Sequence, residues 1–200
     1  MQLNTDLTGL FGVTLAIVAL LVRLPRVQAL PLRQKAGLTA AAIVVLSIPL
    51  WGVSAAGCVR GMTGDLSVST VVLLTLALLR SMFGYALVEE SNRQGMLKAI
   101  AVIALLFYPF ALGFSTFDPY RLGYGNLWFM AALLVLAGWA SLRYSMLLAL
   151  CIALAVAAWS MGWYESPNLW DYLLDPWLAL YAFAAQIKYR IARRREEAHA

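Results

Sequence analysis

Residues 127–163 read LWFMAALLVLAGWASLRYSMLLALCIALAVAAWSMGW, and this stretch decides the fold class. It carries a single charge, that of Arg143. A helix needs roughly 20 mostly apolar residues to cross a membrane, so the stretch is too long for one span and just long enough for two short ones. The polar break at residues 141–144 therefore predicts two helices, 127–142 and 144–163, joined in a tight hairpin.

The rest of the chain has the same apolar character. Of its 200 residues, 62% are hydrophobic and 12% are charged. A soluble domain has roughly 45–50% apolar and about 25% charged residues, so this composition indicates that lipid is the solvent. It excludes a disordered chain, a secreted disulfide scaffold and a soluble nucleic-acid binder.

We therefore predict an all-α, polytopic membrane protein in which residues 1–200 form a single transmembrane helical domain. Seven apolar runs meet the length requirement. The predicted spans are about 7–22, 37–57, 67–87, 96–114, 127–142, 144–163 and 176–192. The first run follows Asp6 and precedes Arg23, which is the reverse of the charge order in a signal peptide, so we expect a first span rather than a cleaved leader.

The basic residues predict the orientation of these spans. Cytoplasmic loops carry an excess of Lys and Arg, and twelve of the fifteen basic residues fall on one side of the seven-span arrangement. These twelve are Arg23, Arg26, Arg33, Lys35, Arg93, Lys98, Arg143, Lys188, Arg190, Arg193, Arg194 and Arg195. We therefore expect a multi-pass protein of a bacterial inner membrane, with its N-terminus outside and its C-terminus in the cytoplasm.

The side predicted to face outward is aromatic and acidic. It holds six of the ten carboxylates and six of the seven tryptophans. The segments 115–126 and 164–175 contain four of these carboxylates together with several aromatic residues. Arg121, flanked by two tyrosines, is suited to a phosphate or a sugar, although a structured turn with interfacial anchors explains the same residues. The candidate partner- or lipid-binding residues are Arg60, Arg80, Asp118, Tyr120, Arg121, Tyr124, Glu165, Trp170 and Asp171.

The sequence predicts the local structure at four positions in or next to the spans. Arg80 is the one charge well inside a span, so its side chain either extends to the cytoplasmic surface or binds a lipid phosphate. Pro49 and Pro109 lie inside predicted spans and should kink them. Asp175 precedes Pro176, and this pair predicts the N-terminal cap of the last span.

The residues that the spans lack restrict the chemistry. The only histidine is His199, so no span can supply a haem ligand or the base of a Ser-His or Cys-His pair. Cys58 and Cys151 share no metal-binding spacing. We expect no catalytic residues, no metal and no cofactor.

Three classes of function remain open. The leading hypothesis is a non-enzymatic subunit or accessory of an envelope complex, whose outer loops recognise a membrane or periplasmic protein, with membrane lipids around it and no nucleic acid. The alternative is a small transporter or a protein that handles lipids or lipid-linked substrates in an outward-facing cavity, where Arg60 and Arg121 bind a phosphate headgroup. The third is a membrane enzyme that uses Asp118, Glu165 or Asp171 as acid or base.

Overall fold

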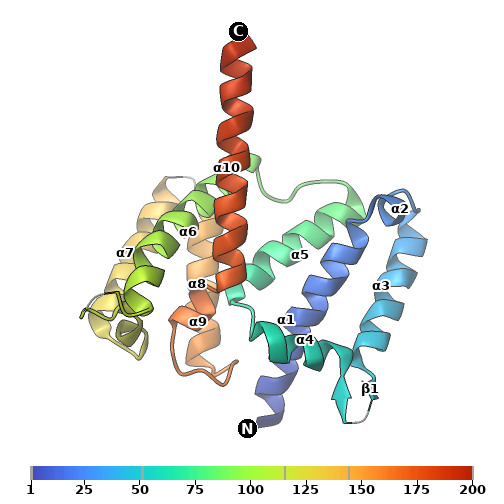
Figure 1. Cartoon of the computed structure of the whole chain (residues 1–200), viewed down its shortest axis with the longest axis horizontal. Helices are drawn as coiled ribbons and strands as arrows, with labels where there is room; N and C mark the ends of the chain where they lie inside the picture. Colours follow the sequence, from blue (N-terminus) through green and yellow to red (C-terminus); the bar gives the residue numbers. More distant parts are fainter. Residues whose placement is uncertain (1, 51, 115, 144, 200) are drawn as a thin grey trace.

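The computed structural model describes residues 2–50, 52–114, 116–143 and 145–199, and these residues form an all-helical protein (Figure 1). Its helices are α1 (Gln2–Val22), α2 (Pro25–Gln28), α3 (Leu32–Ser47), α4 (Ala55–Thr63), α5 (Val68–Phe83), α6 (Glu90–Ala111), α7 (Leu127–Leu142), α8 (Met146–Ser160), α9 (Trp170–Leu173) and α10 (Pro176–His199). A 3-10 helix, η1, covers Pro119–Gly123, and two short antiparallel strands, β1 (Pro49–Leu50) and β2 (Val53–Ser54), form a hairpin. The prediction of an all-α fold is confirmed.

The helices gather in two groups. Helix α10 packs on α6 and α7 packs on α8, while α1 packs on α5, α3 and α4 (Figure 1). Helix α5 joins the groups, because it contacts both α1 and α8. The end that carries α4, α9 and the N-terminus is called the outer end below, and the end that carries α2 and the C-terminus is called the inner end.

The main hydrophobic cluster lies among α6, α7, α8, α9 and α10. Small residues of three helices, such as Ala104, Ala155 and Ala182, are almost completely buried in this cluster. Met96, Leu97 and the longer side chains fill the space between the helices. Helix α3 lies at the periphery and has no buried residue.

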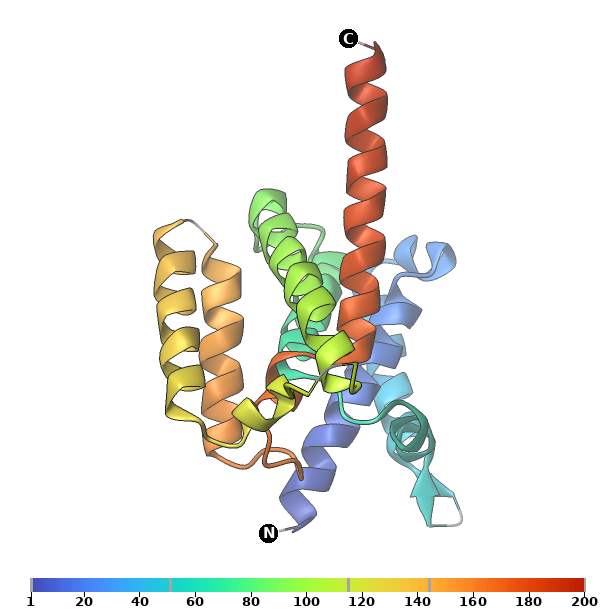
Figure 2. The ribbon, with the colours of Figure 1, turned by 60° about the vertical axis from the view of Figure 1, so that its left-hand side comes forward.

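The division of residues 127–163 into two helices is confirmed, since α7 and α8 run side by side (Figure 2). Helix α8 is shorter than the predicted 144–163, and residue 144 lies outside the described residues. Asn126 caps the start of α7 by accepting hydrogen bonds from the backbone N–H groups of Trp128 and Phe129. At the other end, the N–H of Ser145 donates to the carbonyl of Ala140 and closes the turn. The polar break in the sequence therefore marks the turn correctly.

The expectation of one continuous helix over residues 37–57 is wrong. Helix α3 ends at Ser47, because Ile48 precedes Pro49 and adopts an extended conformation, with ψ at 120°. Gly52 then takes a positive φ of 89° in the turn between β1 and β2. The chain continues as the separate helix α4, so Pro49 ends a helix instead of kinking one.

The third predicted span ends earlier than expected, and the fourth is shifted toward the N-terminus. Helix α5 ends at Phe83 and not at 87, because Gly84 takes the left-handed conformation and its N–H donates to the carbonyl of Arg80. Arg80 therefore lies in the last turn of its helix and is not deep in a span. Helix α6 begins at Glu90, earlier than the predicted 96, and contains Pro109 as predicted.

Among the described residues, α6 is the one helix that is both long enough and apolar enough to cross a membrane. Four shorter apolar helical segments accompany it, at Asp6–Val22, Val68–Phe83, Leu127–Leu142 and Met146–Ser160. Helix α10 begins directly after Asp175, which caps it as predicted, since the N–H of Leu178 donates to the Asp175 carboxylate at 2.8 Å. Its C-terminal half extends beyond the other helices at the inner end (Figure 1).

Candidate functional site

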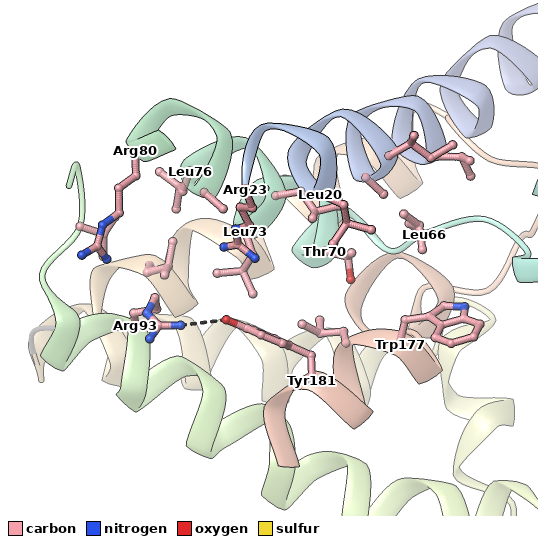
Figure 3. Close-up of a pocket in the computed structure, with 18 of the residues that line it drawn as sticks. Leu20, Arg23, Leu66, Thr70, Leu73, Leu76, Arg80, Arg93, Trp177 and Tyr181 are labelled. Carbon is pink, nitrogen blue, oxygen red and sulfur yellow. Dashed lines mark hydrogen bonds between the residues drawn. The ribbon is translucent and has the colours of Figure 1, made fainter. Parts of the chain in front are cut away.

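A pocket of about 580 Å³ lies between α1, α5 and α10. It is called the arginine pocket below. Most of its lining is aliphatic, and α5 and α1 contribute the largest shares. Three arginines stand toward the inner end, and Trp177 and Leu66 stand toward the outer end (Figure 3). The lining includes Ile17, Leu20, Arg23, Leu66, Thr70, Leu73, Leu76, Ala77, Arg80, Arg93, Trp177 and Tyr181.

The three arginines of this pocket come from three different elements. Arg23 follows the last residue of α1, Arg80 lies in the last turn of α5, and Arg93 lies in the first turn of α6. Arg93 donates to the Tyr181 hydroxyl of α10 at 2.9 Å and to the carboxylate of Glu90 (Figure 3). Within the described part of the chain, Arg23 and Arg80 have no ion pair and no side-chain hydrogen bond. Two guanidinium groups are thus available to a ligand.

The outer end of the pocket is closed by polar contacts. Asp175 is buried and accepts hydrogen bonds from the N–H and hydroxyl of Ser67, at 2.9 and 2.7 Å, and from the hydroxyl of Thr70. It also caps α10, so one carboxylate holds the N-termini of α5 and α10 together. The indole of Trp177 donates to the carbonyl of Thr63 at 3.3 Å. These contacts fix the walls of the pocket at the end opposite the arginines.

The two predicted outer loops, 115–126 and 164–175, are packed against one another. Asn168 is completely buried, and its amide donates to the carbonyl of Tyr120 at 2.9 Å. The N–H of Leu169 donates to the carbonyl of Gly123, where no side chain would fit, because an added Cβ would lie 1.7 Å from the Asn168 oxygen. The loops therefore form one folded cap on the outer end.

Four of the nine predicted site residues, Asp118, Tyr120, Trp170 and Asp171, help to hold this cap together. The Tyr120 hydroxyl donates to Asp171 at 2.9 Å, and Asp171 also accepts a hydrogen bond from Ser166. Burial and the neighbouring Asp171 raise the pKa of Tyr120, so its hydroxyl stays protonated and remains a donor. Asp118 caps η1 by accepting from the N–H of Tyr120.

Trp170 has a comparable structural role. Its ring lies between Phe107 and Phe129, with centroid distances of 4.3 and 4.6 Å, and its indole N–H donates to the carbonyl of Pro119. Segment 164–175 therefore contains a single short helical turn, α9, anchored in the core. Of the predicted loop residues, Arg121, Tyr124 and Glu165 have exposed side chains.

Arg60 lies in a cluster of carboxylates. Its guanidinium is 2.6 Å from Asp65, 2.9 Å from Asp6 and 3.7 Å from Glu165. The hydrogen bond to Asp65 raises the pKa of Arg60, so the arginine stays charged. Three carboxylates already neutralise this side chain, and the structure does not bring Arg60 together with Arg121 in an outward-facing phosphate site.

The sequence predicted Arg80 as a candidate and missed Arg23 and Arg93. Both were assigned to cytoplasmic loops as ordinary topology signals. The sequence did place Arg23 and Arg93 on the same, cytoplasmic side. In the structure, the end of α1, the end of α5 and the start of α6 lie at the inner end. The local sequence could not predict that these three helix ends surround a common cavity, because the cavity is formed by tertiary packing.

The described residues also include the side-chain types that usually bind metal ions. None of their His, Cys, Asp and Glu side chains form a group of three or more that could hold a metal ion. The cysteines are separate, with Cys58 exposed and Cys151 buried. Comparisons with protein-family models, with curated proteins and with solved structures found no match to this chain.

Proposed function

We propose that this chain is a multi-pass membrane protein that binds the hydrocarbon part of a lipid in the arginine pocket. The pocket is the observation that carries the proposal. Its walls are made of leucine, isoleucine, valine and alanine side chains from α1 and α5, and its volume lies in the range of roughly 300–1,000 Å³ typical of ligand sites.

The composition and the distribution of charges support a membrane location. The apolar helices bear many large exposed side chains, including Leu105 and Leu106 on α6 and Leu134 on α7. Large exposed apolar surfaces are rare on soluble monomers, and lipid is the environment that accommodates them. In the seven-span arrangement with the N-terminus outside, the polar end of the pocket would face the cytoplasmic leaflet.

Photo-cross-linking of a lipid, with and without a bulky substitution in the pocket, tests the proposal. The full chain in nanodiscs is incubated with a lipid that carries a photoactivatable group on its acyl chain, and cross-linked peptides are identified by mass spectrometry. We expect cross-links to α1 and α5, and we expect Ala77→Trp to remove them, because Ala77 lines the pocket. Ala131→Trp, at an exposed position of α7, is the matched control. Equal labelling of both variants would refute the proposal.

A second function is favoured by the surface of the outer end. Phe114, Tyr124, Leu127 and Trp128 are exposed there, and Trp128 is 84% exposed. An aromatic surface of this kind suits a protein partner, in agreement with the hypothesis of an accessory subunit of an envelope complex. Gentle isolation from the native membrane would recover a stoichiometric partner, and a chain recovered repeatedly without one would exclude this function.

A further inference from the structure

We infer that Arg23, Arg80 and Arg93 bind the phosphate headgroup of the lipid that occupies the arginine pocket. This inference rests on the proposed function and adds the chemical class of the ligand. The three side chains project from α1, α5 and α6 toward a common space at the inner end of the pocket (Figure 3). The ligand is therefore a lipid whose phosphate lies at this end and whose chain extends toward Trp177.

The charge balance at this end favours an anion. The carboxylate at this end is Glu90, which is paired with Arg93 at 2.9 Å and also lies within electrostatic reach of Arg80, so one negative charge faces several positive ones. Lys35 adds another positive charge, since its ammonium group lies 3.4 Å from the carbonyl of Ser81 beside Arg80. Like charges brought together at the mouth of an apolar pocket repel one another, and an anion bound between them relieves this repulsion.

The chemistry of the side chains points to phosphate. A guanidinium group donates two parallel hydrogen bonds to a phosphate, and Arg23 and Arg80 have all of their donors available. Arg93 is held in place by Tyr181 and by both oxygens of Glu90, so its two remaining N–H donors are fixed in direction. A phosphomonoester can carry two charges and offers more acceptor oxygens than a phosphodiester, and the arrangement should therefore favour a phosphomonoester headgroup.

Three lipids with identical acyl chains test the headgroup. Binding of phosphatidic acid, phosphatidylglycerol and phosphatidylcholine to the purified full chain is measured by native mass spectrometry. We expect the affinity to fall in that order. The double variant R23Q/R80Q should weaken phosphatidic acid binding by about tenfold or more, because it removes charge-assisted hydrogen bonds, and should weaken phosphatidylcholine binding much less.

The matched control is R26Q/R143Q, which removes the same charge from two exposed arginines outside the pocket. Unchanged phosphatidic acid binding in this control supports the inference, and an equal loss in both double variants overturns it in favour of general surface charge. Inorganic phosphate is also tested alone. Failure to detect phosphate binding supports a lipid ligand, whereas binding as strong as that of phosphatidic acid identifies a free anion as the ligand and overturns the lipid assignment.

The failures of the two proposals are distinguishable. If the wild-type protein binds the three lipids equally and Ala77→Trp blocks all of them, the headgroup inference is wrong and the lipid pocket stands. If Ala77→Trp binds every lipid as well as the wild type, the proposed function is wrong.

Discussion

Asp175 is the residue on which the two groups of helices meet. One of its oxygens accepts hydrogen bonds from Ser67 and Thr70 of the α5 N-terminus, and the other accepts the N–H of Leu178 in α10. Helix N-termini favour negative charge because their N–H groups have no partner within the helix. The Asp-Pro pair predicted the cap on α10, but the contribution of Ser67 and Thr70 depends on tertiary packing and could not be predicted locally.

The variant Asp175→Asn should lower the free energy of unfolding by about 3 kcal/mol, because the donors of Ser67 and Thr70 lose a charged acceptor in a buried site. Thermal or denaturant unfolding in detergent, followed by tryptophan fluorescence, measures this change. Glu197→Gln is the control, since it breaks only an exposed ion pair with Arg193 and should change stability by less than about 0.5 kcal/mol. An Asp175→Asn protein as stable as the wild type would contradict this account.

A second prediction at the residue scale concerns Gly123. The variant Gly123→Ala should separate the two outer loops and lower stability by about 1–3 kcal/mol, because the buried Asn168 amide cannot move away while it holds Tyr120 and Trp170. Faster proteolysis of segment 115–126 would report the separation.

Gly138→Ala is the matched control for this variant. An added Cβ on α7 meets no atom within 4 Å, and alanine is favoured over glycine in a helix by up to about 1 kcal/mol. We expect this control to be neutral or stabilising. Equal proteolysis of the two variants would show that the loops do not depend on close approach at Gly123.

At the scale of elements, the sequence predicted the helices that are uniformly apolar and missed the ones that are interrupted. The hairpin of α7 and α8 follows from two apolar runs separated by a single polar break. The segment 37–57 has a similar average hydrophobicity, but Pro49 and Gly52 divide it into α3, a strand hairpin and α4. Backbone restrictions at two residues therefore outweighed the composition of the whole segment.

The side of α8 that faces the core can be tested directly. Ala155 is completely buried against the main cluster, whereas Ala157 is exposed. We expect Ala155→Leu to lower stability by about 1–3 kcal/mol through overpacking and Ala157→Leu to leave it nearly unchanged, as measured by unfolding in detergent. The opposite order would mean that α8 is rotated about its axis relative to the structure.

At the scale of the whole molecule, the distribution of charge predicted which loops share an end. The end of α1, the end of α5 and the start of α6 do lie together at the inner end (Figure 1). The pocket that they surround was not predictable, because its shape depends on the angles between helices. The outer loops were predicted as a recognition surface, and the structure shows that many of their polar side chains bind one another.

The two cysteines offer a test of the orientation. Cys58 is exposed in α4 at the outer end, and Cys151 is buried in α8. If the outer end faces away from the cytoplasm, a membrane-impermeant maleimide should label Cys58 in cells whose outer membrane has been permeabilised, and Cys58→Ser should abolish the labelling. Labelling that requires rupture of the inner membrane would reverse the orientation.

The contact at Asp175 has a consequence for the way the molecule unfolds. The main hydrophobic cluster begins at Val68 and ends at Ala182, whereas α1 buries Val13, Val18 and Val22 outside it. The two regions meet at α5, which packs on α1 and whose N-terminus is joined to α10 through the buried carboxylate of Asp175. Pulling α5 away from α10 would expose that charge and leave its donors unpaired. We therefore expect the intact protein to unfold in a single transition.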